Sequence, residues 1–227
     1  MLDSPPEVSP AVVTEPFPRA SRYADEPWAK AQPMGSNAMW LLESLCLAVD
    51  LEPGMPSFAR NHLLSLTSPG DTVLDPFCGR GTTLLESLLA DRQALASDIN
   101  PVAACVTGAK AHVPVLAAVE SHLVELQRLY KVSGTQSLDQ ERWSLPPFFD
   151  SAFHYLTLRE LLFMRRHLDW RHDEVDRFLT ALALGSLHSE MDKSRSCFSN
   201  QMPRTISTKP AYSIRYWRSR RLRPPRR

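Results

Sequence analysis

The stretch from Thr72 to Asn100, TVLDPFCGRGTTLLESLLADRQALASDIN, constrains the fold of this chain more than any other part of the sequence. A short apolar run ends at Asp75, and a proline and two glycines follow within six residues. A leucine-rich segment of good helix formers comes next, and a second apolar run ends at Asp98. Strand, glycine turn, helix and strand in this order predict the first half of a doubly wound α/β sheet.

The glycines and the second acidic residue have separate expected tasks. Gly79 and Gly81 let the backbone approach a ligand at the carboxyl edge of the first strand, where a side chain would collide with it. Asp98 lies 17 residues beyond Gly81, about where an acidic side chain reaches ribose hydroxyls. The pattern is neither G-x-G-x-x-G nor the Gly-Lys-Thr of a phosphate loop. A pyrophosphate cradle is therefore poorly supported, and a nucleoside ligand without phosphates stays open.

The string DPFCGRGTT resembles the cofactor motif of the amino-methylating DNA methyltransferases, which modify adenine N6 or cytosine N4. The usual form is DPFxGxGTT, and this chain differs from the commonest version by Arg80, where serine is frequent. The lead-in SFARNHLLSLTSPGDTVL and the following SDINPVA are also similar to the family, so that the resemblance covers residues 56–104. A nucleotide-binding glycine turn of another kind is the competing interpretation.

The resemblance implies a Rossmann-like methyltransferase sheet that binds S-adenosylmethionine, with Asp98 holding the ribose. Phe58 matches more loosely a helix that contacts the methionine end of the cofactor. Cys78 lacks the paired base of a nucleophile and is expected to line the pocket wall. The implied cofactor-binding positions are Asp75, Pro76, Phe77, Cys78, Gly79, Gly81, Thr82, Asp98 and Ile99.

Length and composition narrow the class of protein. A chain of 227 residues has room for one domain of ordinary size, with or without a tail. Its four cysteines show no C-x-x-C spacing, and its histidines have no metal-ligand spacing with a partner. No apolar run approaches the roughly 18 residues of a membrane span, and the N-terminus lacks a signal-peptide pattern. A cytoplasmic protein without a metal or membrane span is expected.

The sequence also predicts how the chain is divided. We expect a proline-rich and disordered segment over residues 1–35 and an α/β core that binds S-adenosylmethionine over residues 36–112. A helical insertion over residues 113–190 and a basic C-terminal segment over residues 191–227 are expected to follow. Helices are predicted over Val102–Ala111, Val115–Lys131, about Ser151–Leu168 and Asp173–Leu187. Residues 132–142 are predicted to form a loop, and no strand is expected between residues 102 and 200.

The basic C-terminal segment has the composition of a nucleic-acid contact. Residues 215–227 hold seven arginines and no acid, and basic residues interleave with Tyr212, Tyr216 and Trp217. This mixture pairs phosphate contacts with base stacking. A solvated tail is the competing interpretation. The arginines expected to contact DNA are Arg215, Arg218, Arg220 and Arg221.

Methyl transfer to an exocyclic amine also needs a hydrogen-bond acceptor for that amine and an aromatic wall for the flipped base. In the family this is Asp, Asn or Ser followed by Pro-Pro and an aromatic residue. The nearest string, Leu145-Pro146-Pro147-Phe148, has leucine at the acceptor position, and no strand-like run precedes it. A proline turn that starts a helix is the better interpretation. Catalytic residues are therefore unknown.

The resemblance thus implies an S-adenosylmethionine-dependent methyltransferase for an exocyclic amine of cytosine or adenine in DNA, as in restriction-modification systems. The chain is expected to be a fragment with the cofactor-binding half, truncated before the catalytic motif and dependent on a missing half or partner chain. Two alternatives stay open. One is a non-catalytic remnant that binds the cofactor and nucleic acid, and the other is an RNA or protein amine methyltransferase.

Overall fold

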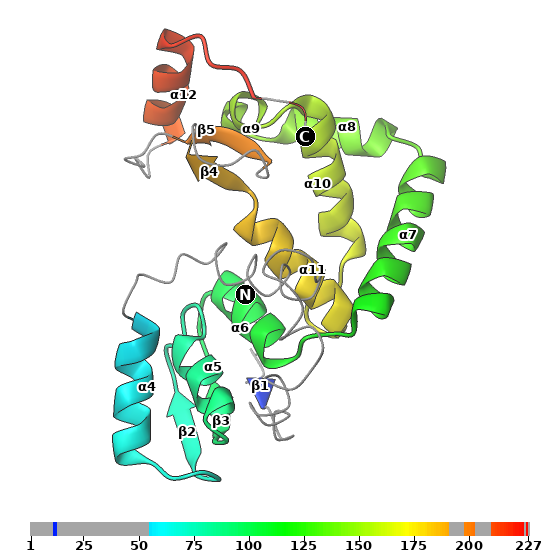
Figure 1. The fold of residues 1–227 in the computed structure, drawn as a ribbon. Coiled ribbons are helices and arrows are strands. Elements are labelled where there is room, and N and C mark those ends of the chain that lie inside the picture. The colour runs from blue at the N-terminus through cyan, green and yellow to red at the C-terminus, as the bar shows by residue number, and fades with distance from the viewer. Residues whose placement is uncertain (1–10, 13–54, 191–197, 203–209, 225, 227) are drawn as a thin grey trace, which may run out of the picture. The chain divides into compact units, whose positions relative to one another are not determined.

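The computed structural model describes residues 11–12, 55–190, 198–202, 210–224 and 226 (Figure 1). The chain divides into two compact units, which we call the first unit (Met1–Leu116 with Trp170–Ala181) and the second unit (Ala117–Asp169 with Leu182–Arg227). Of the segment 1–35, predicted to be disordered, only Ala11 and Val12 are among the described residues, and the prediction otherwise lies outside them.

The first unit contains the strand–helix–strand element that the sequence predicts. β2 (Thr72–Asp75) and β3 (Gln93–Ala96) are parallel and pair over all four residues of each strand. α5 (Thr82–Leu89) connects them and packs on both, since parallel strands need a crossover connection. β1 (Ala11–Val12) pairs antiparallel with β3, which gives the strand order β1-β3-β2 (Figure 1). A parallel α/β element is therefore present.

The core of this element is made of small and branched apolar side chains. Leu84 and Leu88 lie one turn apart on α5, and both are buried. They belong to a cluster with alanines of β3, and its buried members are Cys78, Leu84, Leu88, Ala94, Ala96 and Ala111. α4 (Met55–Leu66) packs against α5, where Arg60 Nη1 lies 3.6 Å from Glu86 Oε2. This packing holds α5, the helix that follows Gly81, in place.

α6 (Pro101–Ala111) follows β3 after a short turn and is buried along its second half. The Asn100 side chain accepts a hydrogen bond from the Val102 N–H at 3.0 Å, and Pro101 occupies the first turn, as is favourable at a helix start. Residues 105–111 are all buried. A Cβ on Gly108 would lie 2.9 Å from the side chain of Arg177, so this glycine permits the close approach of α11 (Glu174–Gly185).

The second unit contains most of the remaining helices that the structure describes. The helix predicted over Val115–Lys131 is confirmed as α7 (Leu116–Val132), and the one over Ser151–Leu168 as α10 (Tyr155–His167). The helix predicted over Asp173–Leu187 is confirmed as α11, whose residues are divided between the two units. α9 (Pro147–Ala152) precedes α10, and α12 (Pro210–Ser219) packs against α9 (Figure 1). A helical region therefore follows the first unit's strands.

The prediction of a loop over residues 132–142 is wrong, because α8 (Gln136–Ser144) occupies most of it. Only Leu138 of α8 is buried, so the apolar period that signals a helix is missing. Ion pairs hold α8 to α10 instead: Arg159 Nη1 lies 3.2 Å from Asp139 Oδ2, and Arg166 Nη2 lies 2.5 Å from Glu141 Oε2.

The prediction of no strand between residues 102 and 200 is also wrong. β4 (His188–Glu190) and β5 (Ser199–Met202) form a short parallel pair in the second unit. The Phe198 N–H donates to the Ser186 carbonyl at 2.8 Å and brings the two strands together. The sequence here is polar and has no apolar alternation, so it carries no strand signal.

The string Leu145-Pro146-Pro147-Phe148 starts a helix, as predicted. α8 ends at Ser144, Pro146 is the N-cap of α9 and Pro147 is its first residue. The ring of Phe148 lies 5.6 Å from the indole of Trp217. No strand leads into the proline pair, so its surroundings are those of a helix start packed on α12.

Candidate cofactor site

The glycine loop, which we define as residues 76–81, joins β2 to α5. Gly79 has a φ of 51° and Gly81 a φ of 75°, a backbone region that other residues adopt only at a cost. The Gly81 N–H donates to the Cys78 carbonyl at 2.7 Å, and Gly81 is the N-cap of α5. The two glycines therefore make a tight left-handed turn at the carboxyl end of β2.

The two glycines differ in what surrounds them. A Cβ on Gly81 would lie 2.8 Å from Thr107 Oγ1 and 2.9 Å from Thr107 Cγ2, so α6 leaves no room there. Among the described residues, a Cβ on Gly79 would meet only the Phe77 carbonyl oxygen, at 4.0 Å. Gly81 is therefore needed for packing, whereas Gly79 leaves one side of the loop open to a ligand.

Asp98, at the end of β3, lies against this loop. Its Oδ2 accepts a hydrogen bond from the Gly79 N–H at 2.8 Å, and its Oδ1 accepts one from the Asn100 N–H at 2.8 Å. These two hydrogen bonds hold the pKa of the Asp98 carboxyl below its usual value of 3.8, and the bond from Asn100 has the larger effect. The carboxyl is therefore ionised at neutral pH. A carboxylate has about four acceptor positions, so capacity remains for two hydroxyl donors.

Large apolar side chains are exposed beside this carboxylate. Phe77 is 85% exposed and Ile99 is 94% exposed. The Phe77 N–H donates to Asp75 Oδ1 at 3.1 Å, and this bond holds the backbone of Phe77 in place. Two such exposed side chains at the same strand ends offer an apolar surface to a flat ring.

The remaining sequence-predicted positions have more modest surroundings. Pro76 is exposed, and its carbonyl accepts a hydrogen bond from Ser97 Oγ at 3.3 Å. Thr82 is half-buried at the start of α5. Phe58 lies on α4, 62% exposed, with its ring 4.2 Å from that of His62. Among the described residues, none of these three forms a hydrogen bond with Asp98.

Cys78 belongs to the glycine loop, but its side chain lies in the core cluster. Its Sγ donates to Thr107 Oγ1 at 3.5 Å. Burial raises the pKa of the Cys78 thiol, and burial raises the pKa of Cys105 to about 11. Since the thiolate is the reactive form, neither cysteine is a nucleophile at neutral pH.

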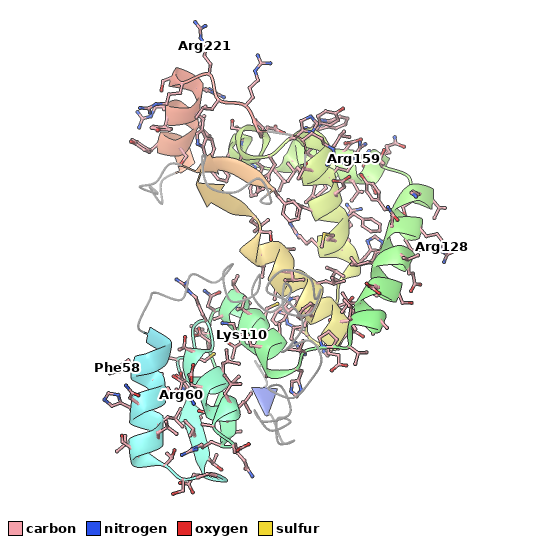
Figure 2. The ribbon with its side chains drawn as sticks, viewed as in Figure 1. Phe58, Arg60, Lys110, Arg128, Arg159 and Arg221 are labelled. Carbon is pink, nitrogen blue, oxygen red and sulfur yellow. The ribbon has the colours of Figure 1, made fainter. Side chains whose placement is uncertain are left out.

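Two residues that sequence reasoning missed hold the loop from α6. Thr107 Oγ1 donates to the Gly79 carbonyl at 3.2 Å, and Lys110 Nζ donates to the Arg80 carbonyl at 2.6 Å (Figure 2 labels Lys110). Both side chains are 2% exposed. The available signal is a threonine and a lysine one turn apart within the apolar run VAACVTGAKA.

The predicted DNA-contacting arginines lie on and just after α12, in the second unit. All four are exposed: Arg215, Arg218, Arg220 and Arg221. The guanidinium of Arg220 lies 3.9 Å from the ring centroid of Tyr216, and the Tyr216 ring lies 6.3 Å from that of Tyr212.

Trp217 requires a correction to the expected role of the C-terminal aromatic residues. It is 1% exposed and packs on Phe148, so its ring is not available to stack on a base. Ser213, one turn earlier, is 4% exposed. Residues 210–219 are therefore a docked amphipathic helix, and the interpretation of these residues as a solvated tail is wrong.

Within the described ranges, no three or more His, Cys, Asp or Glu side chains come together as metal ligands would. The same part of the chain has no helix with the length and apolarity that a bilayer crossing requires.

Comparison with known families gives one match. Residues 56–106 match a family model described as DNA methylase, of the N6/N4 methyltransferase type. The match starts in α4, includes the glycine loop and Asp98, and ends in α6 just before Thr107. No curated protein and no solved structure matches the chain. Residues 56–106 therefore resemble the amino-methylating DNA methyltransferases.

Proposed function

We propose that this chain binds S-adenosylmethionine at the carboxyl ends of β2 and β3 and serves in the methylation of an exocyclic amine of cytosine or adenine in DNA. One observation carries the proposal: the ionised Asp98 carboxylate is held on the glycine loop by the Gly79 N–H at 2.8 Å. Both residues lie within the segment that matches the DNA methylase family.

The residues present suit each part of the nucleoside. Asp98 has acceptor capacity for the two ribose hydroxyls. The exposed side chains of Ile99 and Phe77 offer apolar contact to the adenine ring. The open side of Gly79 lets the ligand approach the backbone closely. The absence of a Gly-Lys-Thr phosphate loop agrees with a ligand that has no phosphates.

When bound, S-adenosylmethionine supplies an electrophilic methyl group that an exocyclic amine takes directly, leaving S-adenosylhomocysteine. The chain's own residues bind and orient the nucleoside, and no cysteine of the loop is a thiolate that could attack. The resemblance implies that the amine is held by an acceptor followed by Pro-Pro and an aromatic residue, and this sequence has no such tetrapeptide. We propose that another polypeptide segment supplies it.

A ligand panel tests the proposed site. Thermal unfolding of the full chain should be followed with S-adenosylmethionine, S-adenosylhomocysteine, NAD or ATP. We expect the first two to raise the melting temperature, because a ligand at 100 times its Kd stabilises the folded state by about 2.7 kcal/mol. NAD or ATP stabilising more than S-adenosylmethionine would favour a glycine turn of another kind and overturn the proposal.

We also propose that the exposed face of α12 contacts DNA phosphates. Arg215 and Arg218 lie one turn apart on the side of the helix away from the buried Trp217. Among the described residues, no salt bridge pairs Arg215, Arg218, Arg220 or Arg221 with a carboxylate. Arg226 differs from them, because both of its terminal nitrogens bind Glu160, at 2.8 and 2.6 Å. Positive charge that no described carboxylate pairs, beside exposed Tyr212, suits a nucleic-acid backbone.

The salt dependence of DNA binding tests this surface. Fluorescence anisotropy with a labelled duplex should be measured between low and moderate salt for the full chain and for an Arg215→Ala/Arg218→Ala double variant. We expect the slope of log affinity against log salt to become shallower by about 2, since each phosphate contact contributes about 0.9.

Arg128→Ala is the matched control, because Arg128 is an exposed arginine on α7 (labelled in Figure 2). It should leave the slope unchanged. The same slope in the double variant as in the unmodified chain would show that α12 does not contact phosphates.

A further inference from the structure

We infer that Thr107 of α6 is a positioning residue that aims the Asp98 carboxylate at the ligand, acting through Gly79. The inference deepens the proposed function and rests on it for the identity of the ligand. Thr107 lies one residue beyond the segment that matches the DNA methylase family.

Gly79 is held from two sides by hydrogen bonds of its own backbone. Its N–H donates to Asp98 Oδ2 at 2.8 Å, and its carbonyl accepts from Thr107 Oγ1 at 3.2 Å. The two groups lie on neighbouring peptide planes that only the φ and ψ of Gly79 join. The Cys78–Gly79 plane is also held by the Gly81 N–H, which donates to the Cys78 carbonyl at 2.7 Å. Since glycine has the freest backbone, the bond from Thr107 to the second plane restrains the rotation about Gly79 that would otherwise turn its N–H away from Asp98. The Thr107 hydroxyl is therefore linked to the carboxylate through one residue.

The hydroxyl of Thr107 has one direction in which to donate. Cys78 Sγ donates to its oxygen at 3.5 Å, which leaves the hydroxyl proton for the Gly79 carbonyl. The side chain is 2% exposed and lies against the backbone of Gly81, where an added Cβ would come within 2.8 Å. A buried and fully constrained hydroxyl can hold the loop in one conformation.

The other hydrogen bonds of the site distinguish positioning of Asp98 by Thr107 from a general stabilisation of the glycine loop. The second donor to Asp98 is the Asn100 N–H, which belongs to the turn of Asp98 itself and not to α6. Lys110 donates to the Arg80 carbonyl, one residue farther along the loop. Loss of the Thr107 hydroxyl should therefore weaken one of two N–H contacts to Asp98 and leave the other, whereas Lys110 acts on the loop beyond Gly79.

A matched pair of variants tests the inference in the full chain. Thr107→Val keeps the shape and removes the hydroxyl, and Thr107→Ser keeps the hydroxyl. The pKa of Asp98 is measured by NMR titration, and the affinity for S-adenosylmethionine by calorimetry. Because N–H donors lower the pKa of this carboxyl, we expect it to rise toward 3.8 in Thr107→Val and to keep the unmodified chain's value in Thr107→Ser. Affinity should fall about tenfold only in Thr107→Val.

A purely structural role would lower the melting temperature of Thr107→Val without moving the pKa of Asp98, and that result would overturn the inference. If Thr107→Val does not fold, Asp98→Ala replaces it, because Asp98 is partly exposed. Linkage predicts that this variant shifts the NMR signals of the Gly79 amide and the Thr107 methyl group; unchanged signals would overturn the inference. Failure of the unmodified chain to bind S-adenosylmethionine would refute the proposed function alone, since the pKa and the NMR signals still report on the link.

Discussion

Replacing Gly81 with alanine should destabilise the folded chain by about 3 kcal/mol or more, measured by urea denaturation. A left-handed conformation costs a non-glycine residue about 1–2 kcal/mol. Gly81 has a φ of 75°, and the added Cβ would lie 2.8 to 3.1 Å from three atoms of Thr107. Forcing an atom into a packed site adds about 1–3 kcal/mol. Both effects act on the turn that starts α5.

Two other glycines provide controls for this prediction. Gly79 shares the positive φ, but its added Cβ would make only an ordinary contact among the described residues, with the Phe77 carbonyl oxygen at 4.0 Å, so Gly79→Ala should cost only the conformational part, about 1–2 kcal/mol. Gly134 has neither feature, so Gly134→Ala should stay within about 0.5 kcal/mol. Equal losses in Gly81→Ala and Gly79→Ala would mean that α6 does not press on the glycine loop.

Replacing Asp98 with alanine should weaken the binding of S-adenosylmethionine at least about tenfold, or 1.4 kcal/mol. The variant removes the ionised acceptor that the Gly79 and Asn100 N–H groups hold at the end of β3. Calorimetric titration measures the affinity, and circular dichroism checks that the chain remains folded. Asp98→Asn, which keeps one carbonyl acceptor, should give an intermediate affinity.

Glu125→Ala serves as the control for this loss of charge. Glu125 is an exposed acid on α7 and lies in the second unit. Its replacement changes the net charge of the chain by the same amount and should leave the affinity unchanged. An equal loss in both variants would point to a general charge effect and not to a ribose contact at Asp98.

The parts of the fold that the sequence predicts are those with a local signal. β2, α5 and β3 are foreseeable because apolar runs end at Asp75 and Asp98 and glycines stand between them. α8 is not foreseeable, because ion pairs to α10 replace an apolar face. β4 and β5 likewise lack apolar alternation.

Only the residues expected to face the ligand could be predicted from the sequence, and the residues that support them could not. The sequence indicates Gly79, Gly81 and Asp98, since glycine turns and acidic strand ends are local patterns. It does not indicate that Thr107 contacts the carbonyl of Gly79, because that contact joins residues 28 positions apart. Trp217 shows the opposite failure: it stands among arginines in the sequence, yet packing against Phe148 buries it.

The most direct measurement is a calorimetric titration of S-adenosylmethionine into the full chain at neutral pH. We predict one site per chain with a Kd on the order of 1–10 μM, or about −7 to −8 kcal/mol. No heat of binding at millimolar ligand, from a chain that is folded by circular dichroism, would contradict the proposed function. The DNA methylase segment would then be a structural element without a working cofactor site.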